Sequence, residues 1–167
     1  MAVEQWTDGQ RDRFIKKLVA SVADQVQDHF KHEAARKATS FDSPIELAFY
    51  LAWQLRHFWY LGQVSGTLAL LPQYKVSANG RDYRLDFAII HEGLRVAIEN
   101  DGHEFHERTP EQVDYRNQRD LDLQNDGWTI VHLSGRQILH DPAGCVQAVQ
   151  DACVMAWDRI LVAGGKF

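Results

Sequence analysis

The sequence predicts an α/β domain in which a mixed β-sheet is flanked by helices, in the order α-α-β-β-β-α-β-α. Three strand-like segments follow one another in the middle of the chain, and a helical segment separates them from a fourth. A hairpin followed by a helical crossover implies antiparallel and parallel pairing in one sheet, with helices on its faces. The 167 residues are 45% hydrophobic and 11% aromatic, which is enough for one sizeable core and too much for a disordered chain.

The first predicted helix runs from residue 8 to about residue 37, because apolar side chains recur every four residues along one face. These side chains are Phe14, Leu18, Val22, Val26 and Phe30. Since this helix precedes the rest of the fold, we divide the chain into an N-terminal helical extension, residues 1–40, and a second domain, residues 41–167.

A second helix is predicted to begin after Ser43, which has the side chain of a helix N-cap. Pro44 suits the first helical position, and Glu46 stands three residues after the cap, as in a capping box. The helix is rich in aromatic residues and is expected to end near Gly62.

Three strands are predicted next, over residues 68–76, 83–90 and 95–99. The dipeptide Asn79-Gly80 between the first two is typical of a tight hairpin turn. A short link containing glycine connects the second strand to the third, so all three are expected to be antiparallel neighbours.

Two later helices are each predicted by a capping residue followed by proline. Thr109 opens the first, which should end before Gly127, and Asp141 opens the second, which should reach about Val162. The apolar segment 128–133 between them is the fourth predicted strand.

The charge balance is acidic, with 18 Lys and Arg against 23 Asp and Glu and a net charge of −5. This argues against a protein that coats nucleic acid or membrane by bulk charge, although it leaves room for a local basic groove. Two cysteines, no apolar signal segment in residues 1–10 and no apolar run of membrane-spanning length predict a cytoplasmic protein without a membrane partner.

Three carboxylates stand out in this pattern. Asp86 interrupts an apolar strand, and strand alternation places it on the face opposite Leu85 and Phe87, while Glu99 and Asp101 share a face at the end of the next strand. A single acid of this kind is more often structural. Three on adjacent strands favour a site for a hard divalent cation, which prefers oxygen ligands.

The arrangement of these acids with their neighbours resembles a known family. The matching residues are Glu46, Pro72, Gln73, the run 83–87, the run 98–109, Arg119, Asp120, Leu123, Gly127 and Trp128. Together they resemble the PD-(D/E)XK nuclease superfamily and, within it, the very-short-patch-repair-like branch. The likeness covers residues 41–149, about two-thirds of the chain.

The resemblance implies a restriction-endonuclease-like fold and cleavage of nucleic-acid phosphodiesters, DNA above all, with Mg²⁺ and with Mn²⁺ able to substitute. Asp86 and Glu99 match the two metal-binding acids. Asp101 stands where much of the superfamily has a lysine, and we expect it to be a further metal ligand or a base. The missing lysine leaves the general base open.

Histidines in the loop after these acids are candidates for proton transfer. His103 and His106 follow the acids directly, and a histidine can exchange a proton near neutral pH. Lys75 and Asp101 are further candidates. The alternative is that the histidines bond loop backbone, or that they form a zinc site with Asp101, which the lack of a supporting cysteine disfavours.

Glu46 has two interpretations. The capping box with Ser43 explains it without a metal, whereas a helix N-terminus near the strand ends would let its carboxylate reach water bound to the metal. We carry Glu46 as a catalytic candidate together with Asp86, Glu99, Asp101, His103 and His106.

Nucleic-acid contacts are expected from polar and basic side chains near these acids. They are Gln73, Lys75, Arg84, Arg108 and Arg119. Lys75 could equally be a solvated residue at a sheet edge, and Arg84 an ion-pair partner of Asp86. Arg116 and Asp120, four residues apart on one helix, are expected to form an ordinary surface pair.

Two functions from different classes follow from the sequence. The first is a metal-dependent endonuclease. The alternative is a catalytically degenerate nuclease-fold module that binds nucleic acid or docks to a larger repair or defence complex. A further hypothesis is a plain interaction protein whose long N-terminal helix forms a homodimer or a partner contact.

Overall fold

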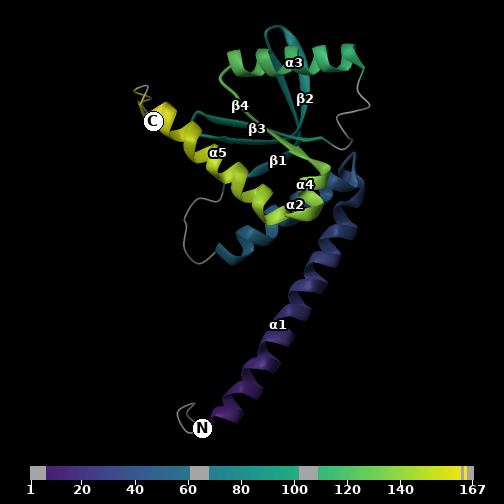
Figure 1. Ribbon diagram of the computed structural model, residues 1–167, viewed down its shortest axis with the longest axis vertical. Helices are drawn as coiled ribbons and strands as arrows, with labels where there is room; N and C mark the ends of the chain where they lie inside the picture. The colour runs from purple at the N-terminus through teal and green to yellow at the C-terminus, as the bar shows by residue number, and fades with distance from the viewer. Residues whose placement is uncertain (1–6, 61–67, 102–108, 163, 165–167) are drawn as a thin grey trace. The chain divides into compact units, whose positions relative to one another are not determined.

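The computed structural model describes residues 7–60, 68–101, 109–162 and 164 (Figure 1). The chain divides into two compact units, Met1–Thr39 and Ser40–Phe167. None of the helices in these residues has the length and apolar character needed to cross a membrane.

The first unit consists of α1 (Asp8–Lys37), and the 3-10 turn η2 (Ala38–Ser40) follows it. Along α1 the apolar side chains of Phe14, Ile15, Leu18 and Val19 are exposed over about half of their surface or more. The helix carries close ion pairs one turn apart, of which Arg36 with Glu33 has the shortest contact, 2.8 Å.

The second unit is a four-stranded sheet in the order β1-β2-β3-β4 with helices around it. Strands β1, β2 and β3 pair antiparallel, and β4 pairs parallel to β3. The expected mixed sheet is therefore confirmed. Its elements are α2 (Pro44–Tyr60), β1 (Leu70–Ala78), β2 (Arg81–His91), β3 (Leu94–Asp101), α3 (Pro110–Asn125), β4 (Thr129–Ser134), α4 (Gly135–His140) and α5 (Pro142–Val162).

Tight turns join the antiparallel strands. Asn79 and Gly80 have φ values of 50° and 74°, and Glu92 and Gly93 have 44° and 89°. Two consecutive residues at positive φ match the twist of a two-residue hairpin, which is why Asn-Gly predicts such a turn.

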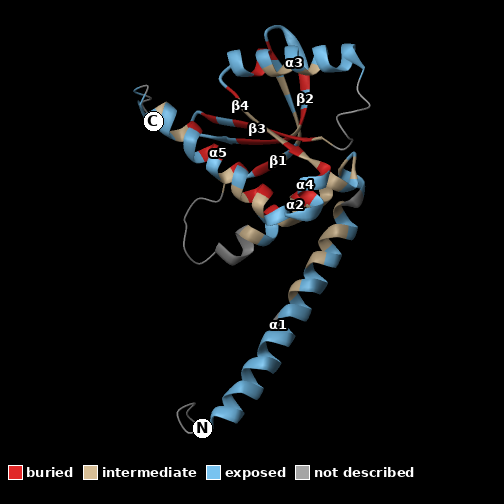
Figure 2. Ribbon diagram, in the orientation of Figure 1, coloured by how far each residue is buried: buried red, intermediate tan, exposed pale blue. Residues whose placement is uncertain are grey.

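Helices cover the two faces of the sheet with separate cores (Figures 1 and 2). On one face α2, α4 and α5 enclose a cluster that includes Phe49, Phe87 and Val146, all fully buried. On the other face α3 contributes Leu123, which packs with Leu85 of β2. This two-sided burial accounts for the nearly continuous apolar run of β3.

The alternation of side chains breaks in the middle of β1 and β2. Leu85 packs in the α3-side core and Phe87 in the other, so the expectation that Asp86 lies opposite both is wrong. The register pairs Tyr74 with Leu85 and Pro72 with Phe87, leaving Gln73 opposite Asp86. Gln73 has φ of 51°, a conformation uncommon for a residue other than glycine. Both strands therefore change face where the candidate site begins.

One element was not expected. Helix α4 follows β4 without a loop, because the side chain of Ser134 accepts a hydrogen bond from the Gln137 N–H and the Gln137 side chain accepts one from the Ser134 N–H. This capping box starts a helix in a segment that carries no proline signal.

Candidate active site

Asp86 and Glu99 lie beside each other on neighbouring strands. The last register pair of β2 and β3 at this end is Phe87 with Ile98, and these two acids are the next residues along each strand. Asp86 Oδ2 accepts a hydrogen bond of 2.7 Å from the backbone N–H of Asn100. The antiparallel hairpin thus brings together two carboxylates that are 13 residues apart in the sequence.

Glu46 joins this end of the sheet from the first turn of α2. Its backbone N–H donates a 3.3 Å hydrogen bond to Ser43 Oγ, as the capping interpretation requires, and its Oε1 accepts one from the Ser43 hydroxyl at 2.9 Å. Its Oε2 accepts a 2.6 Å hydrogen bond from Gln73 Nε2 on β1. The side chain therefore caps its helix and contacts the sheet at once, and the two interpretations do not exclude each other.

Burial raises the pKa of both strand acids. Loss of solvent raises the pKa of Glu99 to about 7 against the attraction of Arg119, and repulsion by Asp86 adds to the rise. Burial also raises the pKa of Asp86, opposed by the Asn100 N–H and reinforced by repulsion from Glu46. Such mutual repulsion among buried carboxylates is the condition that a bound cation relieves.

Two arginines from α3 reach these acids. Arg119 forms an ion pair with Glu99, and both side chains are largely buried. Arg116 Nη2 lies 2.9 Å from Asp101 Oδ2. The expected surface pair of Arg116 with Asp120 is therefore wrong, because Arg116 turns toward β3.

His132 on β4 is a site neighbour that the sequence reasoning missed. It pairs in register with Glu99, its Nε2 lies 2.8 Å from Asp120 Oδ2, and its Nδ1 lies 3.7 Å from Asp101 Oδ2. The signal that singled out Asp86, a polar residue in an apolar strand, applies equally to His132.

The carboxylates fit a hard divalent cation by their chemistry. Glu46 and Glu99 are buried, Asp86 is half-buried, and the buried Oε1 of Gln73 accepts no hydrogen bond within the described segments. Oxygen donors of this kind are the ligands that Mg²⁺ and Mn²⁺ take. No group of three or more His, Cys, Asp or Glu has the spacing of a metal centre in the described part of the chain. Arg119 and Arg116 pair with two of the acids instead.

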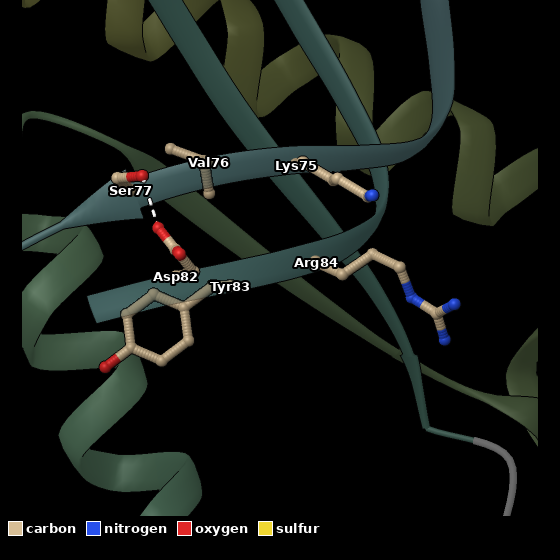
Figure 3. A pocket seen from close by; sticks show the side chains of 6 residues that line it. All are labelled: Lys75, Val76, Ser77, Asp82, Tyr83 and Arg84. Carbon is tan, nitrogen blue, oxygen red and sulfur yellow. Dashed lines mark hydrogen bonds between the residues drawn. The ribbon is translucent and has the colours of Figure 1, made fainter.

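Two of the remaining candidates lie on the β1–β2 hairpin, and the other three lie beyond the described residues. Lys75 and Arg84, cross-strand partners, line a pocket of about 490 Å³ on the β1–β2 hairpin (Figure 3). Both side chains extend away from the hydrogen-bonded Ser77 and Asp82.

Arg84 forms an ion pair with Asp42 rather than with Asp86. His103, His106 and Arg108 fall within residues 102–108, outside the described residues. Whether these three side chains join the acids therefore stays a prediction, as does the zinc alternative.

The mixed sheet with helices on both faces is that of a restriction-endonuclease-like protein. Residues 67–153 match the model of REase_MTES_1575, a restriction-endonuclease-like family, and the match spans slightly more than half of the chain. The chain therefore belongs to this family, which indicates a nuclease; restriction-endonuclease-like nucleases usually use divalent metals. Glu46 lies outside the matched range.

Two further comparisons add little. No curated protein matches the chain. The crystal structure of a protein of unknown function, AF1548, matches with 18% sequence identity and a TM-score of 0.31. The match covers 59% of this chain and 54% of that one, so this chain spans about half the length of that protein.

Proposed function

We propose that the protein is a metal-dependent nuclease that hydrolyses phosphodiester bonds, acting as a DNA endonuclease with Mg²⁺ or Mn²⁺. The observation that carries the proposal is the convergence of Glu46, Asp86 and Glu99 at one end of the sheet. Membership of a restriction-endonuclease-like family supports it independently.

Asp86 and Glu99 would hold the cation, with Glu46 beside them. When bound, the cation would polarise the phosphodiester, lower the pKa of an attacking water and stabilise the leaving oxygen. Gln73 orients Glu46 through its 2.6 Å hydrogen bond, and the Asn100 N–H orients Asp86.

Proton transfer is assigned to Asp101 and to His103 or His106. Arg116 holds the Asp101 carboxylate, which would serve as a further ligand or as the base where the superfamily has lysine. A histidine that titrates near neutral pH suits protonation of the leaving oxygen.

Contacts to the nucleic-acid backbone are assigned to basic side chains around the acids. Lys75 and Arg84 on the hairpin, Arg108 and Arg119 carry the charge that a protein of net −5 needs to hold phosphates, and Gln73 is added as a polar contact.

The test is nicking of supercoiled plasmid with Mg²⁺ and with Mn²⁺. Wild type is expected to nick, whereas Asp86→Asn and Glu99→Gln, which keep the side-chain shape, should lose activity. Glu92→Gln in an exposed turn is the control and should nick like wild type. Metal-independent nicking, or equal nicking by wild type and both site variants, would overturn the proposal.

A second candidate is a nuclease-fold module that binds nucleic acid without cleaving it. The observation that favours it is Asp101, an acid paired with Arg116 where the superfamily has lysine. Calorimetry with Mn²⁺ separates the two, since a module without a metal site has no binding for Glu99→Gln to remove.

Finer assignments are part of the same proposal. We place the chain in the very-short-patch-repair-like branch on the Glu99-Asn100-Asp101-Gly102-His103 run, and in the cytoplasm on its free buried cysteines. Self-association or docking to a larger complex is proposed through the exposed apolar residues of α1. Sedimentation of the chain with and without residues 1–37 tests whether α1 mediates self-association.

A further inference from the structure

Arg119 is a buried cation among carboxylates. Its side chain is 18% exposed and forms an ion pair with Glu99, whose side chain is 9% exposed. Asp86 and Asp120 are also close enough to attract its charge. A guanidinium remains charged at any pH at which the protein is folded, so this positive charge is permanent.

The position of Arg119 conflicts with a metal at the same acids. The Glu99 oxygen that contacts Arg119 is one that a divalent cation at Asp86 and Glu99 would compete for. One positive charge from Arg119 and two from a metal on the same buried carboxylate would repel each other at short range.

The hydrogen-bonding capacity of Arg119 is not filled in this position. Its buried Nε has no hydrogen-bond partner among the residues that the structure describes. A phosphate group can accept two parallel hydrogen bonds from one guanidinium, which satisfies both charge and geometry.

We propose that Arg119 takes the place of the metal ion at Glu99 while no metal is bound. When metal and nucleic acid bind, Arg119 exchanges this carboxylate for a phosphate, so that metal and phosphate bind cooperatively. This inference rests on the proposed metal site at Asp86 and Glu99. Coupling of two ligands is reciprocal, so the metal must tighten phosphate binding by the factor by which phosphate tightens metal binding.

The first measurement is calorimetric titration of the full chain with Mn²⁺ alone. Arg119→Gln removes the competing cation, so it should bind Mn²⁺ about tenfold more tightly than wild type, the worth of one charge-assisted hydrogen bond. Arg95→Gln is the matched control. Arg95 lies on the same strand as Glu99, and the change removes the same charge from an exposed ion pair with Asp126. Arg119→Lys, which keeps the charge, should stay close to wild type.

The second measurement repeats the Mn²⁺ titration with a short phosphorothioate DNA duplex, whose linkages resist hydrolysis. Wild type and Arg95→Gln should bind Mn²⁺ more tightly with the duplex than without it, after subtraction of Mn²⁺ binding by the duplex alone. Arg119→Gln should lose this enhancement. Circular dichroism establishes that each variant is folded.

The outcomes distinguish a failure of this inference from a failure of the proposed metal site on which it rests. If wild type binds Mn²⁺, Asp86→Asn abolishes binding and Arg119→Gln binds no more tightly than Arg95→Gln, the metal site stands and the inference is overturned. If wild type fails to bind and Arg119→Gln binds, the inference is supported in its strongest form. Absence of binding in every variant overturns both.

Discussion

Gln73 Nε2 donates a 2.6 Å hydrogen bond to Glu46 Oε2 and so ties β1 to the first turn of α2. The contact joins two residues that are 27 positions apart, at the point where β1 changes face and Gln73 adopts a positive φ. Most residues other than glycine avoid this backbone conformation. It is maintained here beside the strand acids, and such strained backbone is typical of functional sites.

Gln73→Asn is expected to reduce metal-dependent nicking about tenfold or more, because the shorter amide no longer reaches Glu46 and a hydrogen bond to a charged group is lost. Asparagine tolerates positive φ, so stability should change little. Initial nicking rates and thermal melts measure the two effects. Gln124→Asn on the exposed end of α3 is the control, and a wild-type rate for Gln73→Asn would show that Glu46 is placed without Gln73.

A second prediction concerns Asp122, a buried carboxylate remote from the strand acids. It accepts hydrogen bonds from Tyr83 at 2.6 Å, Arg81 at 2.9 Å and Asn79 at 3.0 Å, which bind α3 to the β1–β2 hairpin. Gln118, one turn earlier on α3, donates a fourth at 2.8 Å. Tyr83→Phe should lower the free energy of unfolding by about 1.5–3 kcal/mol. Urea unfolding measures this.

The control for Tyr83 is Tyr115→Phe, since Tyr115 is exposed on α3. It should stay within about 0.5 kcal/mol of wild type. The Tyr83 hydroxyl and the other donors hold the pKa of Asp122 well below its usual range. Its stabilisation is therefore present above about pH 4, the ordinary value for Asp, and is lost as the pH falls further. Equal effects of the two Tyr→Phe changes would contradict this role.

The sequence predicted the elements of this fold better than the contacts between them. Local signals were sufficient for the capped starts of α2 and α3 and for the Asn79-Gly80 turn, because caps and turns depend on neighbouring residues. They also singled out Asp86 and Glu99, since acids in apolar strands are costly without a partner.

The rest of the site depends on packing that no local pattern contains. The pairs of Arg119 with Glu99 and of Arg116 with Asp101 require α3 to lie on one particular face of the sheet. Helical spacing alone favoured Arg116 with Asp120, because it does not include the packing of α3 against β3. Alternation alone misplaced Asp86, because it does not include the change of face beside Gln73.

A third prediction follows from the burial of Glu99, which raises its pKa to about 7. Between about pH 4.5, the ordinary value, and pH 7, the folded protein binds more protons than the unfolded chain. The contribution of Glu99 to the free energy of unfolding therefore falls as the pH rises through this window and stays low above it. Glu99→Gln should flatten the pH dependence of stability there.

Urea unfolding from pH 5 to pH 8 without divalent metal measures this slope. Slopes are compared rather than absolute stabilities, because Glu99→Gln also takes the ion-pair partner from Arg119. Glu92→Gln at an exposed turn should keep the wild-type slope. A steeper slope in Glu99→Gln would show that this carboxylate is not buried in its neutral form.

The last prediction tests the hairpin that carries Asp86 and its neighbours. Gly80 has φ of 74°, and a Cβ added there would meet no atom within 4 Å, so Gly80→Ala introduces backbone strain without a clash. The strain should lower the free energy of unfolding by about 1–2 kcal/mol.

Gly135→Ala is the control, because its nearest neighbours, Asp101 O and the Ile45 side chain, would lie at an ordinary 3.5 Å. Thermal melts compare the two variants, and equal stability would mean that the turn relaxes to another type. The nicking rate of Gly80→Ala should stay near that of wild type, because the turn lies seven residues from Gln73 and six from Asp86 along its strands.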